Sequence, residues 1–211
     1  AKQLYYSAIS FVDYNIGRIL DQLEESGQID NTLIIFTSDH GEMFGDNGTF
    51  QKFLPYDGLC KIPFIARFPK YLEPGTVDDR MVDLNDLFPT FLDVAEVSYP
   101  ANFWLPGESI FLKDGIKDRK YQYVEHNKDN KRWVSLRNKR YKYNYYYGGG
   151  KEELFDLKND PKEQRNLLFN CNNNELLDMK NSLRMKLVQY EKTWVLNGYV
   201  VNNDVIKLEE Y

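Results

Sequence analysis

The sequence predicts an α/β domain followed by a small antiparallel sheet with a packed helix. Residues 4–26 repeat apolar side chains at steps of three and four, which is typical of a helix. Residues 32–38 form a run of apolar and β-branched side chains, and short aromatic-rich runs follow residue 116. We therefore expect two domains, covering residues 1–115 and 116–211.

The first domain is predicted to begin with the helix over residues 4–26, which Gly27 ends. The apolar run follows as a buried strand, and a second strand is expected at residues 62–69, where prolines mark its ends. A helix is expected over residues 82–96, with Pro89 in its first turn. This order of elements favours a partly parallel sheet.

The second domain is predicted to follow an irregular linker that contains Pro100, Pro106 and Gly107. Its expected strands cover residues 121–126, 132–137, 141–147 and 153–157. A helix is expected from about residue 175 to residue 194. The tyrosines of residues 141–147 are expected to fill the interface between the sheet and this helix, although stacking on sugar rings is an alternative.

Composition excludes some classes of protein. The 211 residues carry a formal net charge of -5, which argues against a nucleic-acid-binding surface. The sequence contains no apolar run of about 18 residues, so no membrane span is expected. Cys60 and Cys171 lie far apart and are expected to be free thiols. The start has neither an initiating Met nor a signal peptide, which suggests a piece of a longer protein or a processed product.

The apolar run ends in the polar segment Asp39-His40-Gly41, which offers a carboxylate oxygen and an imidazole nitrogen to a divalent cation. Alternatively, Asp39 caps a turn and His40 packs on the surface. Lys52 follows a glycine-rich loop and could neutralise an oxyanion near the metal, unless it is an ordinary solvated lysine.

A family resemblance rests on several blocks in chain order, at residues 6–20, 31–42, 48–52, 61–65, 82–90 and 153–167. Together they resemble the sulfatase family of the alkaline-phosphatase-like superfamily. The resemblance implies that the first domain is the C-terminal part of an α/β/α sandwich. It also implies that Asp39 and His40 bind a metal and that Lys52 contacts the sulfate. Calcium is the expected metal, with manganese or zinc as alternatives.

The chain also departs from the family pattern. Neither cysteine lies in the Cys/Ser-x-Pro-x-Arg element, whose cysteine becomes the formylglycine nucleophile of the family. We therefore expect the nucleophile in a missing N-terminal half, and we expect this chain alone to be inactive. Asn47 replaces a frequent histidine, and Asp57 stands where the family usually has glutamate.

Other residues are weaker candidates for substrate binding. His126 ends a predicted strand and could line the substrate pocket, although a structural histidine is the alternative. Arg137 and Lys142 could reach an anionic sugar, or else lie on solvated strand faces.

The resemblance implies a sulfuric ester hydrolase when complete, acting on sulfate esters, with carbohydrates as the expected substrates. One alternative is a non-catalytic module that binds an anionic glycan or a partner chain, and another is a phosphodiester or phosphonate hydrolase. Expected partners are a sulfated small molecule or glycan and the missing half, and the isolated chain is expected to associate with itself. The family suggests a periplasmic, secreted or lysosomal location.

Overall fold

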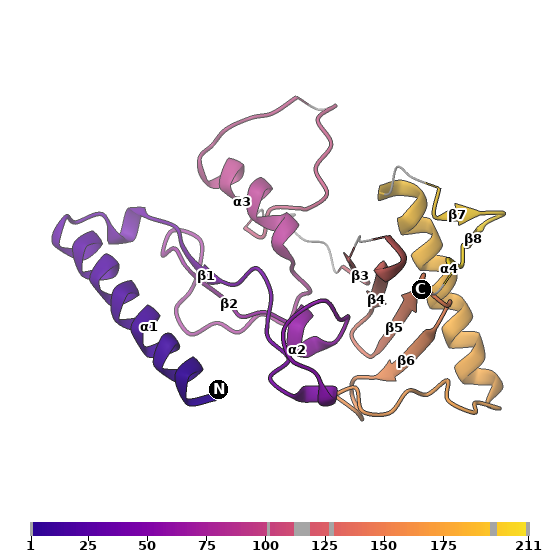
Figure 1. Ribbon diagram of the computed structural model, residues 1–211. Helices are drawn as coiled ribbons and strands as arrows, with labels where there is room; N and C mark the ends of the chain where they lie inside the picture. The colour runs from indigo at the N-terminus through magenta and orange to yellow at the C-terminus, as the bar shows by residue number, and fades with distance from the viewer. Residues whose placement is uncertain (1, 101, 112–118, 127–128, 195–197, 210–211) are drawn as a thin grey trace. The chain divides into compact units, whose positions relative to one another are not determined.

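The computed structural model describes residues 2–100, 102–111, 119–126, 129–194 and 198–209 (Figure 1). Contacts divide the chain into two compact units. Unit 1 comprises Ala1–Asp39, Ile62–Asp79 and Leu84–Ile116. Unit 2 comprises His40–Lys61, Arg80–Asp83 and Lys117–Tyr211, so the loop that carries Lys52 packs with the C-terminal sheet. The predicted domain boundary at residue 115 lies outside the described residues.

The first element of unit 1 is helix α1 (Lys2–Glu25), and none of its residues is buried. The backbone N–H groups of Gly27 and Gln28 donate to the carbonyl oxygens of Glu24 and Leu23, each at 2.9 Å. Gly27 has a φ of 68°, in the left-handed region that glycine adopts at low cost. The predicted helix and its glycine end are therefore confirmed.

Strands β1 (Ile34–Thr37) and β2 (Phe64–Arg67) form a two-stranded sheet in unit 1, after the 3-10 turn η1 (Ile29–Asn31). The strands run antiparallel, with Thr37 opposite Phe64, so the expectation of a partly parallel sheet is wrong for this pair. The chain re-enters the sheet at Phe64, opposite the residue at which β1 ends, so β2 runs back along β1 although the connection between them is long enough for a parallel crossover. Because two strands alone cannot cover both faces, β1 is only half-buried.

The predicted helix over residues 82–96 forms as a turn η3 (Leu84–Asp86) followed by helix α3 (Leu87–Val94), with Pro89 in its first turn. Part of the predicted linker packs against α3. The backbone N–H of Glu108 donates to the Asp86 carboxylate at 3.0 Å, and the Ser109 hydroxyl donates to Asp93 at 2.7 Å.

The main sheet of unit 2 has four antiparallel strands in the order β3-β4-β5-β6. These strands are β3 (Gln122–His126), β4 (Trp133–Arg137), β5 (Tyr141–Tyr146) and β6 (Glu152–Asp156). The remaining elements of unit 2 are η2 (Asp46–Gly48), α2 (Asp57–Cys60), η4 (Asp129–Lys131), α4 (Asn174–Trp194), β7 (Val200–Val201) and β8 (Asp204–Val205). The small antiparallel sheet with a helix is confirmed, and the described chain is a mixed α/β fold.

Helix α4 covers one face of this sheet (Figure 1). Asn173 begins the helix, because its side-chain oxygen accepts the N–H groups of Glu175 and Leu176. Tyr143 and Tyr147 are fully buried in one apolar cluster with helix side chains such as Leu187. The tyrosine run therefore fills the interface between sheet and helix, as predicted.

Two further expectations concern membrane insertion and cysteines. Among the described residues, each helix is too short or too polar to cross a bilayer. Cys60 and Cys171 are both free thiols. Burial raises the pKa of the Cys60 thiol to about 11, so this thiol stays protonated and weakly reactive at neutral pH.

Candidate functional site

Asp39 lies two residues beyond the end of β1, and its side chain is exposed. The Ser38 hydroxyl contacts Asp39 Oδ1 at 3.4 Å. Asp39 is the last residue of its segment in unit 1, and His40 is the first of its segment in unit 2.

His40 and Lys52 face each other in unit 2. The Nζ atom of Lys52 lies 3.1 Å from Nε2 of His40, and Nδ1 of His40 lies 2.8 Å from the carbonyl oxygen of Gly41. A carbonyl can only accept, so Nδ1 carries the proton and Nε2 offers a lone pair to the ammonium group. The structure thus brings together two of the residues that the sequence singled out, twelve positions apart.

Glycine makes the first turn of the loop between these residues possible. The Gly41 N–H donates to the Leu59 carbonyl oxygen at 2.8 Å, and a Cβ on Gly41 would collide with the Gly58 carbonyl oxygen. Only glycine allows this close backbone approach. Beneath the loop, Met43 is 1% exposed and anchors it in the interior.

His126 ends β3 and lies beside two aromatic rings. Its ring centroid is 5.3 Å from that of Phe53 and 5.9 Å from that of Trp133. Phe53 follows Lys52 directly in the chain, so His126 packs one residue away from the candidate lysine. These contacts favour a packing role for His126, while its predicted contact with substrate remains a prediction.

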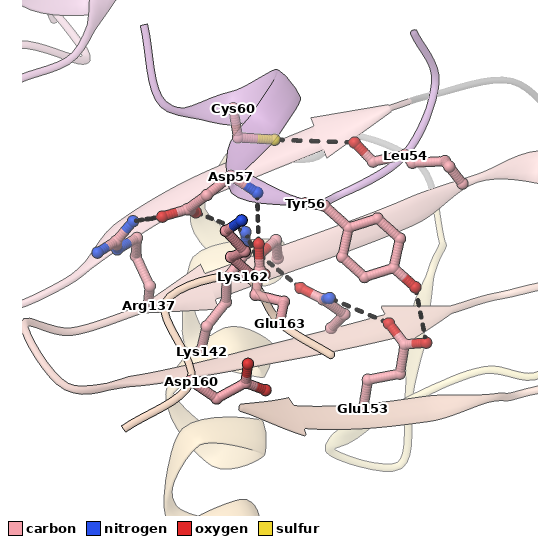
Figure 2. A network of polar contacts seen from close by, with 12 residues as sticks. Leu54, Tyr56, Asp57, Cys60, Arg137, Lys142, Glu153, Asp160, Lys162 and Glu163 are labelled. Atoms are coloured by element: carbon pink, nitrogen blue, oxygen red, sulfur yellow. Dashed lines mark hydrogen bonds and ion pairs between the residues drawn. The ribbon is translucent and has the colours of Figure 1, made fainter. Parts of the chain in front are cut away.

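Arg137 and Lys142 were expected to bind an anionic sugar or to lie on solvated strand faces; the expectation of solvated faces is wrong, and contact with an anionic sugar stays a prediction. Lys142 is 1% exposed and its Nζ lies 2.8 Å from Asp57 Oδ1 and 2.8 Å from Glu163 Oε1. The Arg137 guanidinium binds the same Asp57 at 2.8 Å. Figure 2 shows these side chains gathered below α2. Their charges are matched by carboxylates of the chain itself, so they hold α2 on the sheet.

The two acids of this network, Asp57 and Glu163, have pKa values that are shifted in opposite directions. Burial raises the pKa of Asp57, but the ammonium of Lys142 and the guanidinium of Arg137 outweigh it and hold that pKa below its usual value. Burial raises the pKa of Glu163 above its usual value, although Lys142 acts in the opposite direction. Glu163 also accepts the backbone N–H of Asp57. Asp57 is therefore the ionised centre of the cluster.

A second polar group extends this network along the sheet. The Tyr56 hydroxyl donates to Glu153 Oε1 at 3.1 Å, and the Asn144 amide donates to Glu153 Oε2 at 3.2 Å. Burial, reinforced by the negative charge of Glu153, raises the pKa of Tyr56 to about 12. Asn144 and Lys142 alternate with core tyrosines along β5. In the sequence, this alternation was the only sign that the two side chains lie on the same face of the sheet.

The described residues supply an incomplete set of metal ligands. Within the described ranges, no three His, Cys, Asp or Glu side chains gather around a common point. Asp39 and His40 offer one carboxylate and one imidazole, whereas calcium takes six to eight oxygen ligands. The Nε2 lone pair of His40 also faces the Lys52 ammonium. These residues do not make up a metal centre by themselves.

Comparisons with known proteins show the family to which the chain belongs. A model of the sulfatase family matches residues 1–97. An arylsulfatase of Clostridium perfringens is 34% identical over 217 residues, covering 98% of this chain and 43% of that protein. The chain thus spans less than half the length of this relative.

Two solved structures have similar folds. One, described as a complex with its substrate D-glucosamine-2-N,6-O-disulfate, has a TM-score of 0.76 and 30% identity, over 87% of this chain and 39% of that one. The other, a phosphonate monoester hydrolase of Agrobacterium radiobacter, has a TM-score of 0.74 and 26% identity, over 97% of this chain and 44% of that one. The chain belongs to the sulfatase family and corresponds to a part of its full-length members.

Proposed function

We propose that this chain is the C-terminal portion of a metal-dependent sulfatase that hydrolyses sulfate esters of carbohydrates. The observation that carries the proposal is the pairing of Lys52 with His40 within unit 2. The structural relative described with a disulfated glucosamine supports a sugar substrate. On this proposal, unit 1 contributes to the α/β/α sandwich of the complete protein.

Each residue has a proposed role. Asp39 and His40 contribute two ligands to a divalent cation, for which calcium is the first candidate and manganese or zinc are alternatives. The cation would polarise the sulfate ester when bound. Lys52 places an ammonium group beside the sulfuryl oxygens and stabilises the negative charge that develops on them. Cation and ammonium compete for the Nε2 lone pair, so we propose that Lys52 turns to the substrate when the cation is bound.

The nucleophile is proposed to lie outside this chain, because neither Cys60 nor Cys171 stands in a Cys/Ser-x-Pro-x-Arg element. The family implies a formylglycine in the complete protein. We therefore expect sulfate release from a 6-O-sulfated glucosamine by the complete protein and none by the chain alone. Ion chromatography of released sulfate, with and without a chelator, tests this. Turnover by the chain alone would contradict the proposal, and glycan binding without turnover by the complete protein would favour a binding module.

A phosphonate monoester hydrolase is the second candidate. It is favoured by the structural match to such an enzyme over 97% of this chain. Lys52 would act in the same way, because hydrolysis of a sulfate ester and of a phosphonate ester both place negative charge on the equatorial oxygens of the transferred group. Matched aryl sulfate and aryl phosphonate esters, given to the complete protein, separate the two reactions. A higher kcat/KM for the phosphonate would favour this second candidate.

A further inference from the structure

The backbone around Lys52 is held in a costly conformation. Gln51 has a φ of 70° and Phe53 a φ of 93°, and both are non-glycine residues in the left-handed region. Such conformations cost free energy and persist only where surrounding contacts fix them. The two strained residues lie directly before and after Lys52, so the contacts that hold them also set the direction of its side chain.

Glu42 holds the residue before the lysine. Its Oε1 atom accepts the backbone N–H of Gln51 and, at 3.3 Å, the backbone N–H of Phe44. The Met43 N–H donates to the Gln51 carbonyl oxygen at 3.3 Å, which closes the loop from the other side. One carboxylate therefore joins the start and the end of the loop between His40 and Lys52.

Trp133 holds the residue after the lysine. Its indole Nε1–H donates to the Phe53 carbonyl oxygen at 2.8 Å. Trp133 belongs to β4 and is 4% exposed, so the donor is fixed in the sheet. His126, opposite Trp133 in the register of β3 and β4, packs its ring on both aromatic neighbours.

We propose that Glu42 and Trp133 are positioning residues that together keep the Lys52 ammonium directed at His40 and, in the reaction, at the sulfuryl oxygens. The inference rests on the proposed function for the role of Lys52. Both side chains bind the backbone beside Lys52, and neither is proposed to contact substrate. The C-terminal sheet would then contribute to catalysis through the loop that it holds.

The test compares substitutions in the complete protein. Glu42→Ala removes the acceptor of both N–H groups, whereas Glu42→Gln keeps a side-chain oxygen that can accept them. Trp133→Phe removes the indole donor and retains an aromatic ring. Glu24→Ala, at an exposed position of α1, is the matched control.

Two measurements distinguish positioning from general destabilisation. We expect Glu42→Ala and Trp133→Phe to lower kcat/KM for the sulfate ester at least about tenfold, with Glu42→Gln restoring most of the loss. In a Lys52→Met background, the same two substitutions should have almost no further effect, because they act through that lysine. An equal loss with and without Lys52 would overturn the proposal.

Chemical labelling of Lys52 provides a readout that does not need the sulfatase reaction. The rate of reductive methylation of Lys52, followed by mass spectrometry, should rise severalfold in Glu42→Ala and stay unchanged in Glu24→Ala. If the wild-type protein releases no sulfate but labelling changes as expected, the proposed function fails while the positioning of Lys52 stands. Unchanged labelling in both Glu42→Ala and Trp133→Phe would overturn the positioning itself.

Discussion

Lys52 directs its ammonium at the unprotonated Nε2 of His40, at a distance of 3.1 Å. The carbonyl oxygen of Gly41 fixes this tautomer by accepting from Nδ1. A positive group is thus held beside a potential metal ligand, on the loop from which it is proposed to turn to the sulfuryl oxygens.

The first prediction concerns the charge of Lys52. In the complete protein, Lys52→Met is expected to reduce kcat/KM for a sulfate ester by about 100-fold, because it removes the group that faces the developing charge. Steady-state sulfate release measures the effect. Lys131→Met is the control, since Lys131 is exposed at the end of η4. Equal activity of Lys52→Met and wild type would show that Lys52 takes no part in the reaction.

A second prediction concerns the buried ammonium of Lys142. Lys142→Met leaves the carboxylates of Asp57 and Glu163 without their shared cation. Breaking a buried ion pair in this way is expected to lower the free energy of unfolding by about 3–5 kcal/mol. Urea unfolding followed by circular dichroism provides the measurement, with the exposed Lys158→Met as control. A loss no larger than that of the control would show that the network contributes little.

The third prediction follows from the lowered pKa of Asp57. Its unfolded value is near 3.8 and its folded value is lower, since Lys142 and Arg137 overcome the effect of burial. The ionised carboxylate therefore stabilises the fold above pH 3.8, and this stabilisation is lost as the pH falls through the folded value. The difference in unfolding free energy between wild type and Asp57→Asn should shrink below pH 3.8.

Ionisation of Glu163 should have the opposite effect on stability to ionisation of Asp57. Burial raises its folded pKa above the unfolded value of 4.5. Ionising Glu163 therefore costs stability as the pH rises from 4.5 through the folded value. The stability advantage of wild type over Glu163→Gln should decrease across that range. Parallel pH profiles for Asp57→Asn and Glu163→Gln would contradict this assignment of the two acids.

A fourth prediction concerns the apolar surface of α1. Leu4 is 77% exposed and Phe11 is 70% exposed, within a helix that has no buried residue. Exposed apolar faces of this kind drive association. The chain by itself is expected to form dimers or larger species in light scattering, and Leu4→Gln combined with Phe11→Gln should reduce their fraction. The polar change Arg18→Gln serves as control. A monodisperse monomer at high concentration would oppose the prediction.

The fifth prediction is weak metal binding by the chain alone. Asp39 and His40 provide two ligands, and in the described part of the chain no third acid, histidine or cysteine joins a common group. Calorimetry should therefore detect no calcium affinity in the micromolar range or tighter. Tight binding that persists in His40→Ala would place a calcium site elsewhere, and tight binding lost in that variant would show that two residues suffice.

Regular elements were predictable because their signals are local. The aromatic-rich, alternating run of β5 and the three-to-four spacing along α1 identified these elements, and Gly27 marked one helix end. The pairing of β1 with β2 was not predictable in this way, since the strand direction depends on where the chain re-enters the sheet. His40 and Lys52 were singled out from the sequence as candidates, the family resemblance added their expected roles, and the loop geometry that joins them came from the structure.

The order of the elements, the tyrosine face of the C-terminal sheet and the polar residues that follow β1 could all be recognised in the amino-acid sequence. The burial of the opposite sheet face was visible only in the folded chain. There Lys142 and Arg137 form ion pairs with Asp57 instead of facing solvent. The physical reason is that periodicity shows which residues share a face, but burial depends on what covers that face. Here the cover is the segment around α2, which lies about 80 residues away in the chain.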